Sequence, residues 1–130
     1  MIGLDSGFFI RLLKEDEGAA ALWAKVTAEP QEEALVSCLT LYELQRSGLR
    51  GLTERRKTDL LLDALPHVCR ILWLNDAELV RRAARIAHGN GLAMADALIL
   101  TSLMEANAEV IYTTDSDLER YQAGPPVVRL

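Results

Sequence analysis

The chain has 130 residues, half of them hydrophobic, which suits one globular domain over residues 1–130 and leaves little room for a second. It has neither a run of about 20 apolar residues for a membrane span nor a basic and then apolar leader, so we expect a cytoplasmic protein with no membrane contact. The net charge of −5 argues against nucleic-acid binding through bulk positive charge, because neutralising phosphates calls for a basic surface.

Short apolar segments alternate with helical patterns along the chain. The first half predicts a strand over residues 1–5, a helix near Phe8, a helix over 17–29 ended by Pro30, a strand over 34–38, a helix opened by residues 40–43 that breaks near Gly48 or Gly51, and a helix over 54–64 before Pro66. The second half predicts a strand over 68–74, a helix from residues 75–78 to His88, a buried helix over 93–106, a strand over 109–113, a short helix from Ser116 and an edge strand at 127–128. This alternation predicts a three-layer α/β/α sandwich with a short, mainly parallel sheet of four to five strands.

In such sheets, ligands bind beyond the carboxyl ends of the strands, so acids at these ends are candidates for a site. Asp5 ends the first predicted strand, and Asp115 follows the fourth within Thr113–Asp117. Each acid could instead cap the helix that follows it. Around Asp115, however, two acids and two hydroxyls are more than a cap needs.

Two further carboxylates belong to predicted helices. Asp96 is the only charge between Gly91 and Met104, and burying an unpaired carboxylate costs several kcal/mol. We therefore expect a cation, a hydrogen-bond cage or an opening to water at Asp96, although an acid in the first helical turn also suits the helix dipole. Glu43 follows a strand end, but with Thr40 it matches a capping box, which would explain it without any site.

Three or four carboxylates that meet in one site repel one another and raise each other's pKa. A hard divalent cation such as Mg²⁺ or Mn²⁺ relieves that repulsion, since it prefers oxygen ligands and is often held by a few carboxylates together with a substrate phosphate. The carboxylates therefore indicate metal-assisted phosphoryl chemistry.

Four segments together resemble the PIN-domain family, and specifically VapC-like toxin ribonucleases of toxin–antitoxin pairs. They are residues 2–6 (IGLDS), 41–44 (LYEL), 95–99 (ADALI) and 113–118 (TTDSDL). The resemblance covers essentially the whole chain. Members of the family often have Ser or Asn at the position of Gly7, where this chain departs from the pattern.

The resemblance implies an acidic metal site for an endoribonuclease. Its catalytic and metal-binding residues would be Asp5, Glu43, Asp96 and Asp115, with Asp117, Ser6 and Thr114 as outer members. It further implies Mg²⁺ or Mn²⁺ as cofactor, RNA as substrate, a homodimer, and an antitoxin protein that occupies the active site.

Two basic groups are candidates for RNA contact, although each could be an ordinary solvated face. The first contains Arg46 and Arg50, and the second contains Arg82 and Arg85. Outside the site, His67 and His88 are interpreted as turn and C-cap residues, and Cys38 and Cys69 as core residues.

Three alternative functions remain open. A phosphoacceptor receiver domain would need a Lys after its last strand, but no Lys occurs after Lys57. A haloacid-dehalogenase phosphatase would need a second acid at Gly7. A PIN-like interaction module that has lost turnover would keep the fold, but all four acids are still present.

Overall fold

The structure is a computed structural model that describes residues 1–29, 31–114 and 116–130. Its elements, in chain order, are β1 (Ile2–Leu4), α1 (Ser6–Leu13), α2 (Glu17–Ala28), β2 (Ala34–Ser37), α3 (Cys38–Leu49), α4 (Arg55–Val68), β3 (Arg70–Leu72), α5 (Ala77–Asn90), α6 (Met94–Glu105), β4 (Val110–Thr113), the 3₁₀ helix η1 (Ser116–Arg120) and β5 (Val127–Arg129). The alternation of strands and helices expected from the sequence is confirmed.

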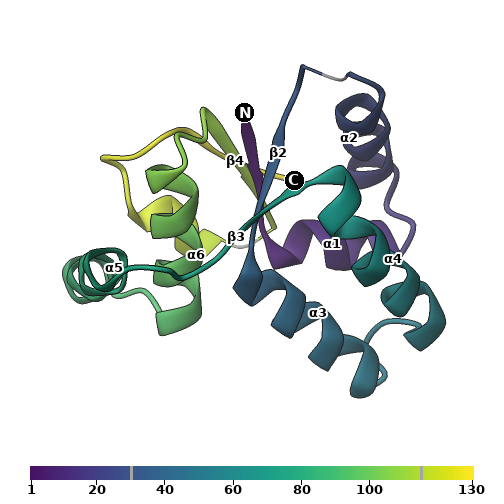
Figure 1. The fold of residues 1–130 in the computed structure, drawn as a ribbon, viewed down its shortest axis with the longest axis horizontal. Coiled ribbons are helices and arrows are strands. Elements are labelled where there is room, and N and C mark those ends of the chain that lie inside the picture. The colour runs from purple at the N-terminus through teal and green to yellow at the C-terminus, as the bar shows by residue number, and fades with distance from the viewer. Residues whose placement is uncertain (30, 115) are drawn as a thin grey trace.

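The strands form one parallel sheet with the order β3-β2-β1-β4-β5, so β1 is its central strand (Figure 1). Successive side chains of a strand point to opposite faces, and in β2 Leu35 packs on one face while Val36 packs on the other. One hydrophobic core lies between the sheet and α5, α6 and η1; the other lies between the sheet and α1 to α4. The three-layer α/β/α prediction is therefore confirmed.

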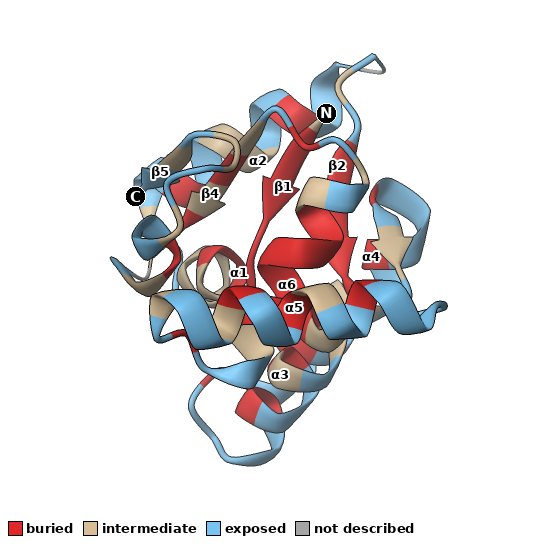
Figure 2. Cartoon of the chain, turned by 90° about the vertical axis from the view of Figure 1, so that its left-hand side faces the viewer, coloured by how far each residue is buried: buried red, intermediate tan, exposed pale blue. Residues whose placement is uncertain are grey.

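Burial follows this layering, as Figure 2 shows. The central strands β1 and β2 are buried along their whole length, and α6 is buried from Ala97 to Leu103. By contrast, α5 buries one stripe and exposes the rest to solvent, which is typical of an amphipathic surface helix. None of the helices that the structure describes is long and apolar enough to cross a bilayer.

Side chains cap most of the helices. Oxygens of Asp5, Asp16, Ser37, Glu54 and Asp76 accept hydrogen bonds from backbone N–H groups in the first turns of α1 to α5. These groups have no partner within the helix itself, so each cap fixes where its helix begins. At α6 the cap position is Ala93, which offers no such side chain.

Two helix boundaries differ from the predictions. Helix α3 begins at Cys38 with Ser37 as its cap, so Thr40 lies inside the helix and the capping-box interpretation is wrong. Helix α4 continues through Pro66 to Val68, which shortens the third strand to Arg70–Leu72. Proline removes one backbone hydrogen bond from the last turns of α4. The neighbouring Leu65 is completely buried, however, and this packing outweighs the local preference.

Candidate active site

A cavity of about 180 Å³ opens at the carboxyl edge of the sheet. It is lined by Asp5, Ser6, Gly7, Ile10, Glu43, Asp96, Ile99, Thr114 and Leu118. These residues come from the junction of β1 and α1, from α3 and α6, and from the segment after β4. The parallel sheet therefore brings three of the four predicted carboxylates to one cavity.

Asp5 is held rigidly at the end of the central strand, where it is only 6% exposed. Its Oδ1 accepts a hydrogen bond of 3.0 Å from the Phe8 N–H, and its Oδ2 accepts one from the Thr113 hydroxyl. Asp5 is therefore both a helix cap, as the capping alternative predicted, and a residue of the cavity wall. The bond from Thr113 ties the start of α1 to the end of β4.

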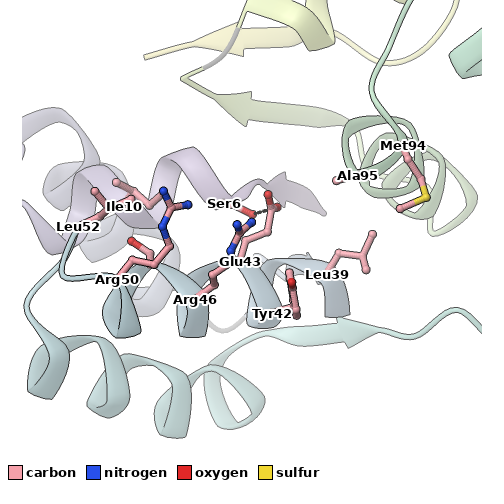
Figure 3. A pocket seen from close by; sticks show the side chains of 11 residues that line it. Ser6, Ile10, Leu39, Tyr42, Glu43, Arg46, Arg50, Leu52, Met94 and Ala95 are labelled. Carbon is pink, nitrogen blue, oxygen red and sulfur yellow. Dashed lines mark hydrogen bonds between the residues drawn. The ribbon is translucent and has the colours of Figure 1, made fainter.

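Glu43 is held from across the site rather than by its own helix. The Ser6 hydroxyl donates a hydrogen bond of 2.6 Å to Glu43 Oε1 (Figure 3). Ser6 Oγ also lies 3.1 Å from Thr40 Oγ1. Residues three apart lie on the same helix face, so the spacing that resembled a capping box instead places both Thr40 and Glu43 against Ser6. The strongest argument against a site role for Glu43 is thereby removed.

Asp96 is half-buried and lies in the first turn of α6, which corrects the expectation of a buried carboxylate. The apolar stretch around it reflects the burial of residues 97–103, whereas residues 93–96 form the more open start of the helix. A negative charge suits this end of the helix dipole, and the same carboxylate faces the cavity. An opening is one of the arrangements expected for Asp96, and the cavity provides it.

Gly7 and Thr114 meet directly in the cavity wall. A Cβ atom on Gly7 would lie 2.0 Å from Thr114 Oγ1, far inside contact distance. The space that a side chain at position 7 would occupy is therefore filled by the Thr114 hydroxyl, so the cavity wall is polar here although residue 7 is a glycine.

Two further acids of this region, Asp115 and Asp117, were also predicted as site residues. Asp115 lies outside the described residues, so its predicted site role stays a prediction. Asp117, predicted as an outer member, forms an ion pair of 3.1 Å with Arg120 and is absent from the residues that line the cavity.

The donor atoms at the cavity fit a hard divalent cation. The polar side chains that line it are carboxylates and hydroxyls, and such oxygens are the ligands that Mg²⁺ and Mn²⁺ prefer. Within residues 1–29, 31–114 and 116–130, no group of three or more acidic, His or Cys side chains is close enough to hold a metal ion. The described carboxylates thus share a cavity without converging on one point.

A second cavity of about 340 Å³ adjoins the first and shares Ser6, Ile10 and Glu43 with it (Figure 3). Its other lining residues are Leu39, Tyr42, Arg46, Ser47, Arg50, Leu52, Met94 and Ala95. Two of the predicted RNA-binding arginines therefore lie beside the carboxylates. Neither forms an ion pair with the part of the chain that the structure describes.

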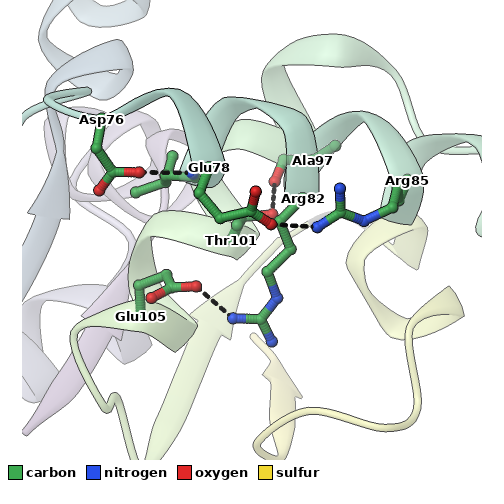
Figure 4. Close-up of polar contacts among 8 residues, drawn as sticks. Asp76, Glu78, Arg82, Arg85, Ala97, Thr101 and Glu105 are labelled. Carbon is green, nitrogen blue, oxygen red and sulfur yellow. Dashed lines mark hydrogen bonds and ion pairs between the residues drawn. The ribbon is translucent and has the colours of Figure 1, made fainter.

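The other two predicted arginines are engaged elsewhere on the molecule (Figure 4). Arg82 pairs with Glu105, and this hydrogen bond raises the pKa of the Arg82 guanidinium. Arg85 pairs with Glu78, and the hydrogen bond and charge of Arg85 lower the pKa of the Glu78 carboxyl. Glu105 is nine residues along α6 from Asp96, about 13 Å by the helical rise, so Arg82 lies near the opposite end of α6 from the cavity.

The sequence reasoning missed three residues around these cavities. Thr113 and Thr40 are fully buried hydroxyls next to Asp5 and Ser6, and Tyr42 is an exposed aromatic on the rim of the second cavity. The only local signal was their position: Thr113 ends a strand, and Thr40 stands three residues before Glu43.

The family model described as PIN domain matches residues 2–124. The chain belongs to the PIN-domain family. This is a family of nucleases, so a cavity lined by carboxylates is in keeping with it. None of the curated protein sequences matches the chain.

Solved structures of low sequence identity share this PIN fold. The Mycobacterium tuberculosis toxin VapC20, described as cleaving the sarcin-ricin loop, has 21% identity and a TM-score of 0.75, with 100% of both chains covered. A Klebsiella pneumoniae toxin–antitoxin complex has 20% identity and a TM-score of 0.73, with 98% of this chain and 96% of that chain covered. VapBC-1 from nontypeable Haemophilus influenzae has 18% identity and a TM-score of 0.75, over 99% and 98% of the two chains.

Proposed function

We propose that this PIN-domain protein is a Mg²⁺- or Mn²⁺-dependent endoribonuclease and the toxin of a toxin–antitoxin pair. The observation that carries the proposal is the small cavity onto which Asp5, Glu43 and Asp96 open from three separate elements. The family supports nuclease chemistry, and the structural neighbours that are toxin–antitoxin complexes support an antitoxin as partner.

In the proposed reaction, a bound divalent cation would activate water and stabilise the charge that develops on the phosphodiester. Asp5, Glu43 and Asp96, joined by Asp115, would hold the cation. The chain's other residues orient these ligands: Thr113 holds Asp5, and Ser6 holds Glu43. Arg46 and Arg50 would attract the phosphates of the RNA beside the carboxylates.

The proposal extends to the assembly. We expect a homodimer in the cytoplasm, with a small antitoxin protein that covers the active site until it is removed. A gene for such a protein should lie beside this one, and expression of this chain alone should arrest growth. If growth continued although the RNA was cleaved, the toxin role would be excluded and the nuclease role kept.

The nuclease proposal is tested with Asp96→Asn. A labelled single-stranded RNA is incubated with the wild-type chain in Mn²⁺, in Mg²⁺ and in EDTA, and the variant is assayed in the same way. We expect cleavage only with metal, and a loss of at least about 100-fold in Asp96→Asn, because metal assistance contributes several kcal/mol to the transition state.

The matched control is Asp63→Asn, which removes an exposed carboxylate on α4, away from the residues that line both cavities. Circular dichroism of both variants checks that the fold is intact. Full activity in a folded Asp96→Asn would exclude Asp96 from the chemistry. Absence of cleavage by the wild-type chain with either metal would favour the interaction module instead.

A further inference from the structure

Tyr42 is a highly exposed aromatic residue on the rim of the second cavity, with 63% of its surface accessible to solvent. Tyrosine combines an apolar ring with a polar hydroxyl and is enriched at binding surfaces, so its place on a cavity that also has carboxylate and guanidinium groups suits contact with a ligand. Its neighbour on α3 is Glu43, which lines both cavities. Tyr42 is thus adjacent to the carboxylates without being one of them.

Two basic side chains follow Tyr42 at helical spacing along α3. Arg46 and Arg50 come four and eight residues later, so all three share one face of α3 with a rise of about 6 Å between neighbours (Figure 3). Within the described chain these two guanidiniums have no acidic partner, which leaves their charge for a ligand. An aromatic ring followed by two cations suits one ligand chemistry, an unpaired base followed by its backbone phosphates.

We infer that α3 is the binding face for single-stranded RNA, with Tyr42 stacking on an unpaired base and Arg46 and Arg50 binding the adjoining phosphates. This inference rests on the proposed ribonuclease function and adds Tyr42 as a residue that contacts the substrate. The Tyr42 ring would place the nucleotide next to Glu43, so that the neighbouring phosphodiester lies at the carboxylate cavity. Tyr42 is a specificity residue here, because it contacts the substrate and takes no part in the bond cleavage.

A base can stack on the Tyr42 ring only when it is unpaired, because a paired base stays inside the RNA double helix. The same cavity is also lined by the apolar side chains of Leu39 and Met94, and Met94 is highly exposed. Such an apolar surface accepts any base face and gives little discrimination among the four bases. We therefore expect selection of unpaired over paired RNA, with weak preference for base identity.

The test measures binding without cleavage. Fluorescein-labelled decaribonucleotides are titrated with the full chain in EDTA and followed by fluorescence anisotropy. Tyr42→Ala should weaken binding by about 5- to 150-fold, which is the range measured for loss of one base–aromatic stack. Tyr42→Phe should stay within about twofold of wild type, because the ring face is kept.

Trp73→Ala is the matched control, because Trp73 is also 63% exposed but is not among the residues lining either cavity. It should bind RNA as the wild type does. A fully paired duplex of the same sequence should bind equally well to wild type and to Tyr42→Ala. A decamer made of abasic nucleotides should bind the wild type more weakly than the RNA decamer does, and should bind wild type and Tyr42→Ala equally well.

The outcomes separate this inference from the proposed function. If the wild type binds RNA and depends on Tyr42 but cleaves nothing, the inference stands and the nuclease proposal fails. If it cleaves RNA and Tyr42→Ala binds as tightly as wild type, the inference is overturned and the nuclease proposal stands. A change in oligomeric state with unchanged RNA affinity in Tyr42→Ala would also overturn it, in favour of a protein contact at Tyr42.

Discussion

The Ser6 hydroxyl donates a hydrogen bond of 2.6 Å to Glu43 Oε1 and thereby joins the first turn of α1 to the second turn of α3. Ser6 is itself buried, next to Asp5, at the end of the central strand. The bond fixes the orientation of a carboxylate whose own helix offers it no partner. It makes Ser6 a positioning residue for Glu43.

We predict that Ser6→Ala lowers kcat/KM for RNA cleavage by about 10- to 100-fold, the range found when a group that orients a metal ligand is removed. The free energy of unfolding should fall by roughly 1 to 3 kcal/mol, because Glu43 loses a charge-assisted hydrogen bond. Metal-dependent cleavage assays and urea unfolding measure the two effects.

The control for Ser6→Ala is Ser102→Ala, which removes a buried hydroxyl without a hydrogen-bond partner in the described structure. Such a removal should leave both activity and stability close to wild type. Glu43→Gln should fold normally, since its amide oxygen still accepts from Ser6, but lose activity. Unchanged activity in Ser6→Ala would show that Glu43 needs no support from Ser6.

Gly7→Ala should lower RNA cleavage, because its Cβ would displace the Thr114 hydroxyl from the cavity wall. We predict that the loss depends on Thr114. In a Thr114→Ala background, Gly7→Ala should cost much less, since the closest neighbours of the new Cβ are then the Cβ of residue 114 at 3.2 Å and Asp5 Oδ1 at 3.5 Å. A double-mutant cycle on kcat/KM checks this. Equal losses in both backgrounds would contradict a direct contact.

The two arginine pairs should differ in their effect on RNA affinity. Arg46→Ala with Arg50→Ala should weaken binding and reduce the slope of log K against log salt by about 0.7 for each phosphate that is no longer neutralised. Arg82→Ala with Arg85→Ala should change neither value much, because these guanidiniums already pair with Glu105 and Glu78. Binding titrations at several salt concentrations measure both slopes. Equal slopes for the two double variants would contradict the assignment of phosphate binding to Arg46 and Arg50.

The two cysteines should react differently with iodoacetamide. Burial raises the pKa of the Cys69 thiol from its ordinary value of 9.0 to about 12, so at pH 8 it is a neutral, shielded thiol. Cys38 is half-buried and should be alkylated first. Mass spectrometry of the folded and the urea-unfolded chain tests this, and rapid labelling of Cys69 in the folded chain would contradict it.

The raised pKa of Cys69 also makes the free energy of unfolding depend on pH. Because the folded pKa of Cys69 lies above the unfolded value, its contribution to stability is complete below about pH 9 and is lost as the pH rises toward 12. Cys69→Ala should therefore flatten the fall in unfolding free energy between these two pH values. An unchanged alkaline profile in that variant would assign the loss to other groups.

Much of the architecture could be read from local patterns. Alternating apolar segments predicted the strands, and the position of Asp5 at a strand end predicted either a helix cap or a site residue; the structure shows both. These features depend on residues within a few positions of each other, so a single sequence contains them. The pattern failed where packing overrides local preference, as at Pro66, which lies inside α4.

By itself, the sequence determined the α/β class, the edge of the sheet at which the acids gather and the oxygen chemistry they offer. Only the tertiary structure decided that Glu43 contacts Ser6 across 37 positions, that Asp96 opens onto a cavity, and that Arg46 lies at the site while Arg82 is paired elsewhere. The physical reason is that such contacts depend on the strand order and on the packing of α3 and α6 against the same edge. That order arises from the whole core, and no short segment encodes it.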